Sequence, residues 1–266
     1  MENSILFALF ITLLAGLSTG VGGMLAFVIK SNNRSLLSWG LGFSAGVMIY
    51  VSFVELLRQA ETSLVTSIGA PGGNWVTIAA FFGGIAISIL LDRLVPEQTS
   101  YHDMRMGEGP EETPHLENKL KRMGVFTAFA IALHNFPEGL ATFVGAMEEP
   151  VLGVSLAIAI SIHNIPEGMS VALPIYYATG NKLQAFRLAL LSGLAEPVGG
   201  LAGYLILHSF FNELVFGITF AAVAGIMVYI SLDELLPMAR ESGTGHTEMG
   251  GLVMGMLVMA VSLLLF

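Results

Sequence analysis

The sequence predicts an all-α membrane protein with eight transmembrane helices, and three observations lead to that prediction. Hydrophobic residues make up 54% of the 266 residues and charged residues only 12%, about half the charged share of a soluble domain. The mean hydropathy is +0.75. A helix needs about 20 apolar residues to cross a bilayer, and runs of that order occupy residues 4–29, 36–57, 75–95, 124–147, 151–178, 183–207, 214–236 and 250–266.

The polar parts of the chain set its domain organisation. We expect one transmembrane domain over residues 1–266, with a polar cytoplasmic loop at about 96–121. That loop contains His102 and His115 among several acids, and we interpret it as a solvated linker in preference to a loose metal site. The first apolar run lacks a basic start and is too long for a signal peptide, so we treat it as a true span.

The distribution of charge predicts an orientation and excludes some functions. Ten of the eleven Lys and Arg residues fall on one side of the expected membrane, and only Arg58 falls on the other. The positive-inside rule therefore puts both termini outside the cytoplasm. The net charge of -9 argues against nucleic acid as a partner. Cysteine is absent, so a thiolate metal site is excluded.

Two apolar segments repeat each other. Residues 45–57 read AGVMIYVSFVELL and residues 224–236 read AGIMVYISLDELL, which match at eight of thirteen positions. The expected topology runs these two spans in opposite directions through the membrane. Such a pair indicates an inverted repeat, with spans 1 to 3 mirrored by spans 6 to 8 around the central spans 4 and 5.

A six-residue motif, His-Asn-x-Pro-Glu-Gly, occurs at 134–139 and again at 163–168, in the middle of spans 4 and 5. Residues three and four apart share one face of a helix, so each copy presents its His, Asn and Glu together. A carboxylate at the membrane centre costs about 2.5–3.5 kcal/mol, so we prefer a metal site to a polar cluster that only joins two helices. The candidate ligands are His134, Asn135, Glu138, His163, Asn164 and Glu167.

Two further residues join the candidate site, and one segment is set aside. Glu196 is a third acid in the middle of a span, again beside a proline. Met48 offers a soft thioether, for which both ligation and packing stay open. The small residues of the first span, including Gly16, Thr19 and Gly22, are interpreted as helix packing without chemistry.

The doubled motif, the third Glu-Pro pair and the eight-span layout resemble the ZIP family of metal-ion transporters, and in particular its bacterial ZupT-type zinc uptake permeases. The resemblance implies a binuclear site between spans 4, 5 and 6. It implies one ion at His134, Glu138, His163, Glu167 and, as an option, Met48. It implies a second ion at Asn135, Glu138, Asn164, Glu167 and Glu196. It also implies a multi-pass protein of the bacterial cell membrane.

We therefore predict uptake of divalent cations into the cytoplasm by alternating access, with Zn2+ and Fe2+ as cargo and Mn2+, Co2+ and Cd2+ as further candidates. Divalent ions and the lipid bilayer are the expected partners, and a homodimer is left open. We expect no enzyme and no catalytic cofactor. The alternative function is an intramembrane zinc-dependent hydrolase, but the His-Glu-x-x-His pattern of many such sites is absent.

Overall fold

The computed structural model describes residues 2–28, 33–94, 112–148, 150–207 and 212–264. Within these ranges the regular elements are all helices and no strand is found. The prediction of an all-α fold is therefore confirmed for the described part of the chain.

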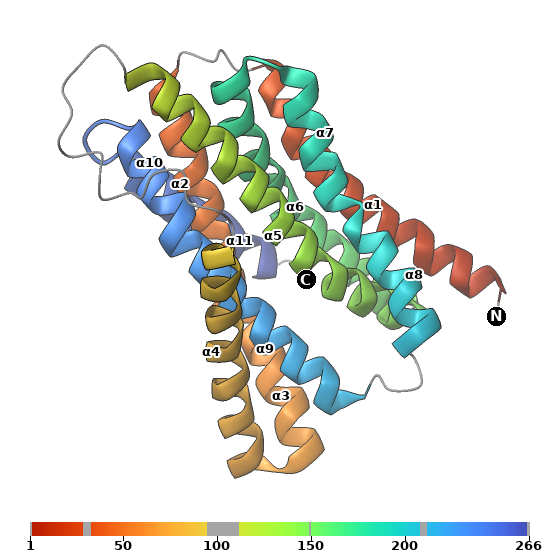
Figure 1. Ribbon diagram of the computed structural model, residues 1–266. Coiled ribbons are helices and arrows are strands. Elements are labelled where there is room, and N and C mark those ends of the chain that lie inside the picture. The colour runs from red at the N-terminus through yellow and green to blue at the C-terminus, as the bar shows by residue number, and fades with distance from the viewer. Residues whose placement is uncertain (1, 29–32, 95–111, 149, 208–211, 265–266) are drawn as a thin grey trace.

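Figure 1 shows how the helices are arranged. Two of them, η1 and η3, are single turns of π-helix inside longer helical stretches. The elements are α1 (Glu2–Val28), α2 (Arg34–Val51), η1 (Ser52–Leu56), α3 (Leu57–Ile68), α4 (Ala70–Leu94), α5 (Glu112–Glu148), α6 (Pro150–Thr179), α7 (Lys182–Gly193), α8 (Ala195–Leu207), α9 (Glu213–Ile230), η3 (Ser231–Leu235), α10 (Leu236–Ser242) and α11 (Thr247–Leu264).

Six helical stretches of the described chain are long and apolar enough to cross a membrane. They agree with six of the eight spans that the sequence predicts. The other two expected spans, 124–147 and 151–178, lie on α5 and α6, which are not among the six, so the count of eight stays a prediction. The six stretches are Ser4–Leu25, Arg34–Ile68, Ala70–Leu90, Lys182–Leu205, Glu213–Ser242 and Thr247–Leu264.

Asparagine side chains start three of the helices. The Oδ1 atom of Asn33 accepts from Leu36 N at 3.1 Å at the start of α2. Asn181 caps α7 and Asn212 caps α9 in the same way, each through a 3.0 Å bond to the backbone N–H three residues later. A cap of this kind satisfies a backbone donor that the first helical turn would leave without a partner.

The polar loop is shorter at its C-terminal end than the sequence predicts. Residues 96–111 of the expected 96–121 loop lie outside the described residues, but α5 already begins at Glu112. Hydropathy alone placed the boundary at the start of the apolar run, whereas the helix continues outward through a polar stretch.

The sixth expected span is broken in the middle. Residues 183–207 divide into α7 and α8, with a turn at Leu194. Pro197 has no N–H to donate to the carbonyl of Gly193, four residues earlier, so one helical hydrogen bond cannot form here. The break sets Glu196 in the first turn of α8.

The helices pack in two groups (Figure 1). The motif group consists of α1, α5, α6, α7 and α8, and it contains both copies of the motif. The flanking group consists of α2, α3, α4, α9, α10 and α11 with the two π-helices. The most extensive packing lies within each group, between α1 and α6, α5 and α6, and α5 and α8 in the first, and between α2 and α11 and α4 and α9 in the second. The groups meet chiefly where α2 contacts α6 and α5 contacts α9.

Candidate metal centre

The two copies of the motif lie on neighbouring helices, the first on α5 and the second on α6. The side chains of the two copies meet directly, because His163 Nε2 lies 3.3 Å from Glu138 Oε2. This contact joins an imidazole from the second copy to a carboxyl group from the first. The structure thus places one residue of each copy in contact with the other.

Proline distorts the hydrogen bonding of α6 at the motif. Pro166 lies inside this helix and has no N–H to offer the carbonyl of Ile162, four residues earlier. The carbonyl of Pro166 itself accepts a 2.6 Å hydrogen bond from Ser44 Oγ of α2, a buried side chain. Ser44 thus ties the flanking group to the second copy of the motif, one residue before Glu167.

The described His, Asn and Glu side chains of the motif are buried almost completely. None of them exposes more than 3% of its surface, and neither does Glu196. Burying ionisable groups at membrane depth is costly unless they pair with each other or hold a ligand. The set with its exposures is Asn135 0%, Glu138 2%, His163 3%, Asn164 0%, Glu167 0% and Glu196 0%.

Backbone carbonyls fix the orientation of both asparagine amides. Asn135 Nδ2 donates to the carbonyl of Ser192 at 3.2 Å, and Asn164 Nδ2 donates to the carbonyl of Ala15 at 3.0 Å. A carbonyl can only accept, so the nitrogen must face it and the amide oxygen must face away. In the described part of the chain neither Oδ1 atom has a hydrogen-bond partner, and both are buried. The Oδ1 atoms of Asn135 and Asn164 are thus two buried neutral oxygens of a type that can bind a cation.

Glu196 lies beside both motif glutamates. Asn164 Nδ2 donates a hydrogen bond to Glu196 Oε1, and the charges of Glu138 and Glu167 both act on the Glu196 carboxyl group. Its other oxygen, Oε2, is buried and has no hydrogen-bond partner within the described ranges. The positive end of the α8 dipole favours a carboxylate in this first turn, whereas three neighbouring carboxylates repel one another.

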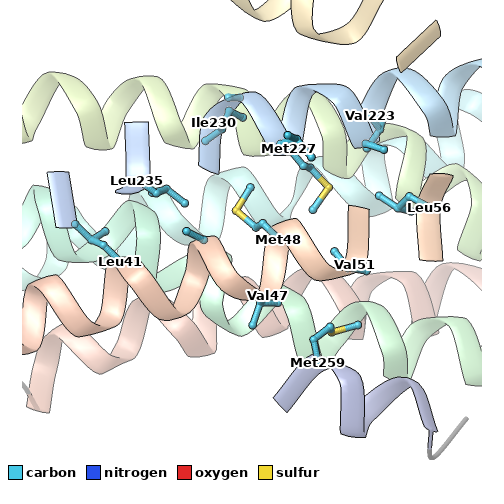
Figure 2. Packing of buried hydrophobic residues seen from close by; sticks show 14 of the residues in the cluster. Leu41, Val47, Met48, Val51, Leu56, Val223, Met227, Ile230, Leu235 and Met259 are labelled. Atoms are coloured by element: carbon cyan, nitrogen blue, oxygen red, sulfur yellow. The ribbon is translucent and has the colours of Figure 1, made fainter. Parts of the chain in front are cut away.

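Met48 takes a different position. Its side chain is fully buried, but it belongs to the apolar cluster that joins α2 to α9 and includes Met227 (Figure 2). The structure brings it to the same helix face as Ser44, four residues earlier on α2. Its ligand role therefore stays a prediction.

One predicted ligand cannot be placed. The backbone of His134 is part of α5, but its side chain lies outside the described residues. Among the side chains that are described, no three or more His, Asp and Glu residues lie close enough together to hold a metal ion by themselves. The site is a collection of buried donors around α5, α6 and α8, with imidazole, carboxylate and amide atoms that suit a divalent cation of borderline softness.

Sequence reasoning missed the residues that support these donors. Ser44, Ala15 and Ser192 contribute a hydroxyl or a backbone carbonyl from helices distant in sequence. A carbonyl carries no sequence signal, so Ala15 could not be found from residue type. Ser44 had a weak signal, since it lies one helical turn from Met48.

The chain is similar in sequence to a known family and to several named proteins. Residues 93–263 match the family described as ZIP Zinc transporter. The chain belongs to this family. It is 53% identical to a "Zinc transporter ZupT" from Clostridium perfringens, over 99% of this chain and 97% of that protein. Proteins of the same name from Chlorobium chlorochromatii and Chlorobaculum parvum are 54% and 55% identical, over the full length of both chains in each case.

Membership of the family decides several sequence predictions. ZIP family members are transporters and not enzymes, so the prediction of a transporter is confirmed and the hydrolase alternative is rejected. The family and the six apolar helices together identify a multi-pass membrane protein with metal ions as substrates.

Proposed function

We propose that this protein carries zinc into the cytoplasm through the buried site between α5, α6 and α8. The observation that supports the proposal most is the contact of Glu138 with His163 across the two motif copies, next to a third buried acid, Glu196. Relatives that are more than half identical over the whole chain are named zinc transporters. A divalent cation would offset the mutual repulsion of the three carboxyl groups.

The ligand set follows from the chemistry of the donors and from the family resemblance. We propose a binuclear site in which Glu138 and Glu167 bridge two ions. One ion would be held by His134, Glu138, His163, Glu167 and Met48, and the other by Asn135, Glu138, Asn164, Glu167 and Glu196. The oriented amide oxygens of Asn135 and Asn164 support the second position. The oxygen-rich second position would admit Fe2+, Mn2+, Co2+ and Cd2+ as well as Zn2+.

Transport requires that the ion leave the site again. A closed structural zinc site holds its ion by about 10–16 kcal/mol, which would trap the cargo. We propose that the motif group moves against the flanking group to open the site to each side in turn. The division of packing into two groups supports this movement.

The inverted repeat and the count of eight spans form part of the same proposal. The π-helices η1 and η3 begin at Ser52 and Ser231, which are equivalent positions of the two matching segments. Ser52 Oγ donates to the Met48 carbonyl at 2.6 Å, and Ser231 Oγ donates to the Met227 carbonyl at 2.8 Å. In addition, α2 packs against α11 and α9 packs against α4. These two contacts are equivalent if spans 2 and 3 correspond to spans 7 and 8.

The orientation follows from charge alone. We propose that the protein lies in the bacterial cell membrane with both termini outside the cytoplasm, on the basis of the ten Lys and Arg residues on one side. Labelling of a cysteine introduced at Ser4 with a membrane-impermeant reagent in intact cells tests this, because the natural chain has no cysteine.

Uptake of radiolabelled zinc into proteoliposomes tests the proposal as a whole. We expect Glu138→Gln and Glu167→Gln to reduce uptake by at least about 10-fold, since even residues behind the ligands of metal sites commonly cost 10–100-fold in affinity. Glu248→Gln is the matched control. Glu248 is also a buried carboxylate, but it pairs with Arg240 at 3.5 Å. We expect zinc uptake by the Glu248→Gln variant to stay within about 2-fold of the native value. Normal uptake by well-folded Glu138→Gln and Glu167→Gln proteins would refute the site.

A further inference from the structure

A second internal repeat links the first helix to the broken one. Residues 16–23 of α1 read GLSTGVGG and residues 193–200 of α7 and α8 read GLAEPVGG, so five of the eight positions are identical. In this alignment Thr19 of α1 stands where Glu196 stands in α8. This alignment also agrees with the correspondence between spans 1 and 6 in the proposed inverted repeat.

Glu196 meets the first copy of the motif through two glycines. A Cβ atom added at Gly139 of α5 would lie 2.0 Å from the carbonyl oxygen of Glu196. A Cβ atom added at Gly199 of α8 would lie 2.1 Å from the carbonyl oxygen of Phe136. Both glycines are therefore needed for the backbones of α5 and α8 to approach this closely.

Thr19 meets the second copy of the motif in the same way. A Cβ atom added at Gly168 of α6 would lie 1.9 Å from the carbonyl oxygen of Thr19, and one added at Gly22 of α1 would lie 2.0 Å from that of Ile165. Gly168 and Ile165 are the motif positions that correspond to Gly139 and Phe136. Thr19 thus has the same backbone relation to α6 that Glu196 has to α5.

The asparagine contacts repeat this correspondence. The Ala15 carbonyl, which accepts from Asn164, and the Ser192 carbonyl, which accepts from Asn135, occupy equivalent positions just before the two glycine-rich segments. Asn164 also donates to the Glu196 side chain. By the same symmetry, the side chain of residue 19 belongs next to Asn135, whose Oδ1 atom is buried without a hydrogen-bond partner in the described chain.

The Thr19 hydroxyl lacks the bond that threonines in helices usually make. Thr12 on the same helix donates to the carbonyl of Ala8, four residues earlier, at 2.7 Å. The corresponding carbonyl for Thr19 is that of Ala15, which already accepts from Ser18 Oγ at 2.6 Å as well as from Asn164. Thr19 is 0% exposed, and its Oγ1 has no hydrogen-bond partner among the described residues. Few buried polar atoms of folded proteins lack a hydrogen-bond partner unless they bind a ligand, a water or an ion.

We propose that the hydroxyl oxygen of Thr19 is a further ligand of the transported divalent cation, as the neutral counterpart of Glu196. The proposal rests on the proposed function, since it assigns a new donor to the same site. It replaces the interpretation of the first span as packing alone. A neutral hydroxyl is a hard oxygen donor, so it supports Mn2+ more than Zn2+. The site would then have a charged side at α8 and a neutral side at α1.

Competition between two metals tests this ligand. In proteoliposomes taking up radiolabelled zinc, Thr19→Val should raise the Mn2+ concentration needed for half inhibition by at least about 10-fold, with a smaller change in zinc uptake itself. Thr19→Ser keeps the hydroxyl and should stay within about 2-fold of the native value. Thr12→Val is the matched control, because it removes a buried hydroxyl of α1 that already has a partner.

The outcomes separate this inference from the proposed function. If the native protein takes up no zinc, the proposed function fails. If the native protein takes up zinc and Thr19→Val behaves like Thr12→Val, the function stands and the ligand role of Thr19 is overturned. If Thr19→Val does not elute as a single species in detergent, Thr19→Ala carries the same expectation, because it also removes the oxygen and adds no bulk.

Discussion

The motif group and the flanking group are both built from apolar helices, but they hold different material at their centres. The motif group buries three carboxyl groups, an imidazole and two amides. The apolar cluster of the flanking group includes Leu41, Val51, Met227 and Ile230 (Figure 2), and it extends onto α5 and α6. A polar centre can bind and lose an ion, whereas an apolar centre can only pack. Under the proposed function, the motif group carries the chemistry and the flanking group supports it.

Substitutions of two glycines should have the largest effect and should distinguish the motif group from the flanking group. A Cβ atom at Gly139 would lie 2.0 Å from the Glu196 carbonyl oxygen, and one at Gly84 would lie 1.9 Å from that of Ala222. We expect Gly139→Ala and Gly84→Ala each to lower the free energy of unfolding by about 2 kcal/mol, measured by thermal unfolding in detergent. Only Gly139→Ala should also weaken zinc binding by titration, because only it displaces a site helix.

Gly83 supplies the control for both variants. It neighbours Gly84 on α4, but a Cβ atom there would meet nothing within 4 Å. Alanine is the better helix former by about 0.5–1 kcal/mol, so Gly83→Ala should leave stability unchanged or slightly raised. An equal loss of zinc affinity in Gly84→Ala and Gly139→Ala would mean that the two groups do not divide binding and support between them.

Removing the hydroxyl of Ser44 should have an intermediate effect. Its 2.6 Å bond to the Pro166 carbonyl joins the two groups at the motif, and a typical bond of this kind contributes about 0.5–1.5 kcal/mol. We expect Ser44→Ala to change the KM for zinc uptake by about 2–10-fold. Ser52→Ala is the control, since the Ser52 hydroxyl donates to the Met48 carbonyl of its own helical stretch. A KM that moves equally in both variants would assign the effect to helix stability.

Replacing either of two buried methionines with leucine should give the smallest effect. Met48 and Met227 occupy equivalent positions of the repeat and share one apolar cluster. Leucine has a similar volume, so each exchange should cost less than about 1.5 kcal/mol in stability. If Met48 is a soft ligand, Met48→Leu should weaken Cd2+ competition with zinc by about 3-fold and Met227→Leu should not. Equal competition in the two variants would make Met48 a packing residue.

Much of the fold could be predicted because the bilayer restricts the choices. Apolar length alone located six spans that the structure has as helices. Hydropathy could not locate the helix ends in polar surroundings, which is why α5 begins at Glu112 rather than near 124. It also could not find the break at Leu194, because an apolar run reads the same whether its helix is continuous or not.

The candidate site divides in the same way between what residue types reveal and what packing decides. Glu138 and His163 could be predicted, because ionisable residues of a repeated motif inside a span are costly to bury and mark functional sites. Thr19 was missed, because its residue type is common in packed spans and its buried hydroxyl becomes notable only beside α6. Ser44 was missed, because its partner Pro166 is distant in sequence and only helix crossing joins them.

The paired π-helices also bear on the history of the chain. A π-turn contains one residue more than the α-helical turn it replaces, so it marks an insertion of a single residue. Such insertions begin at the equivalent positions Ser52 and Ser231. If the two halves descend from one ancestral gene, the simplest order of events puts that insertion before the duplication. The ancestor would then have been a three-span unit that already carried the extra residue and assembled as two oppositely inserted copies.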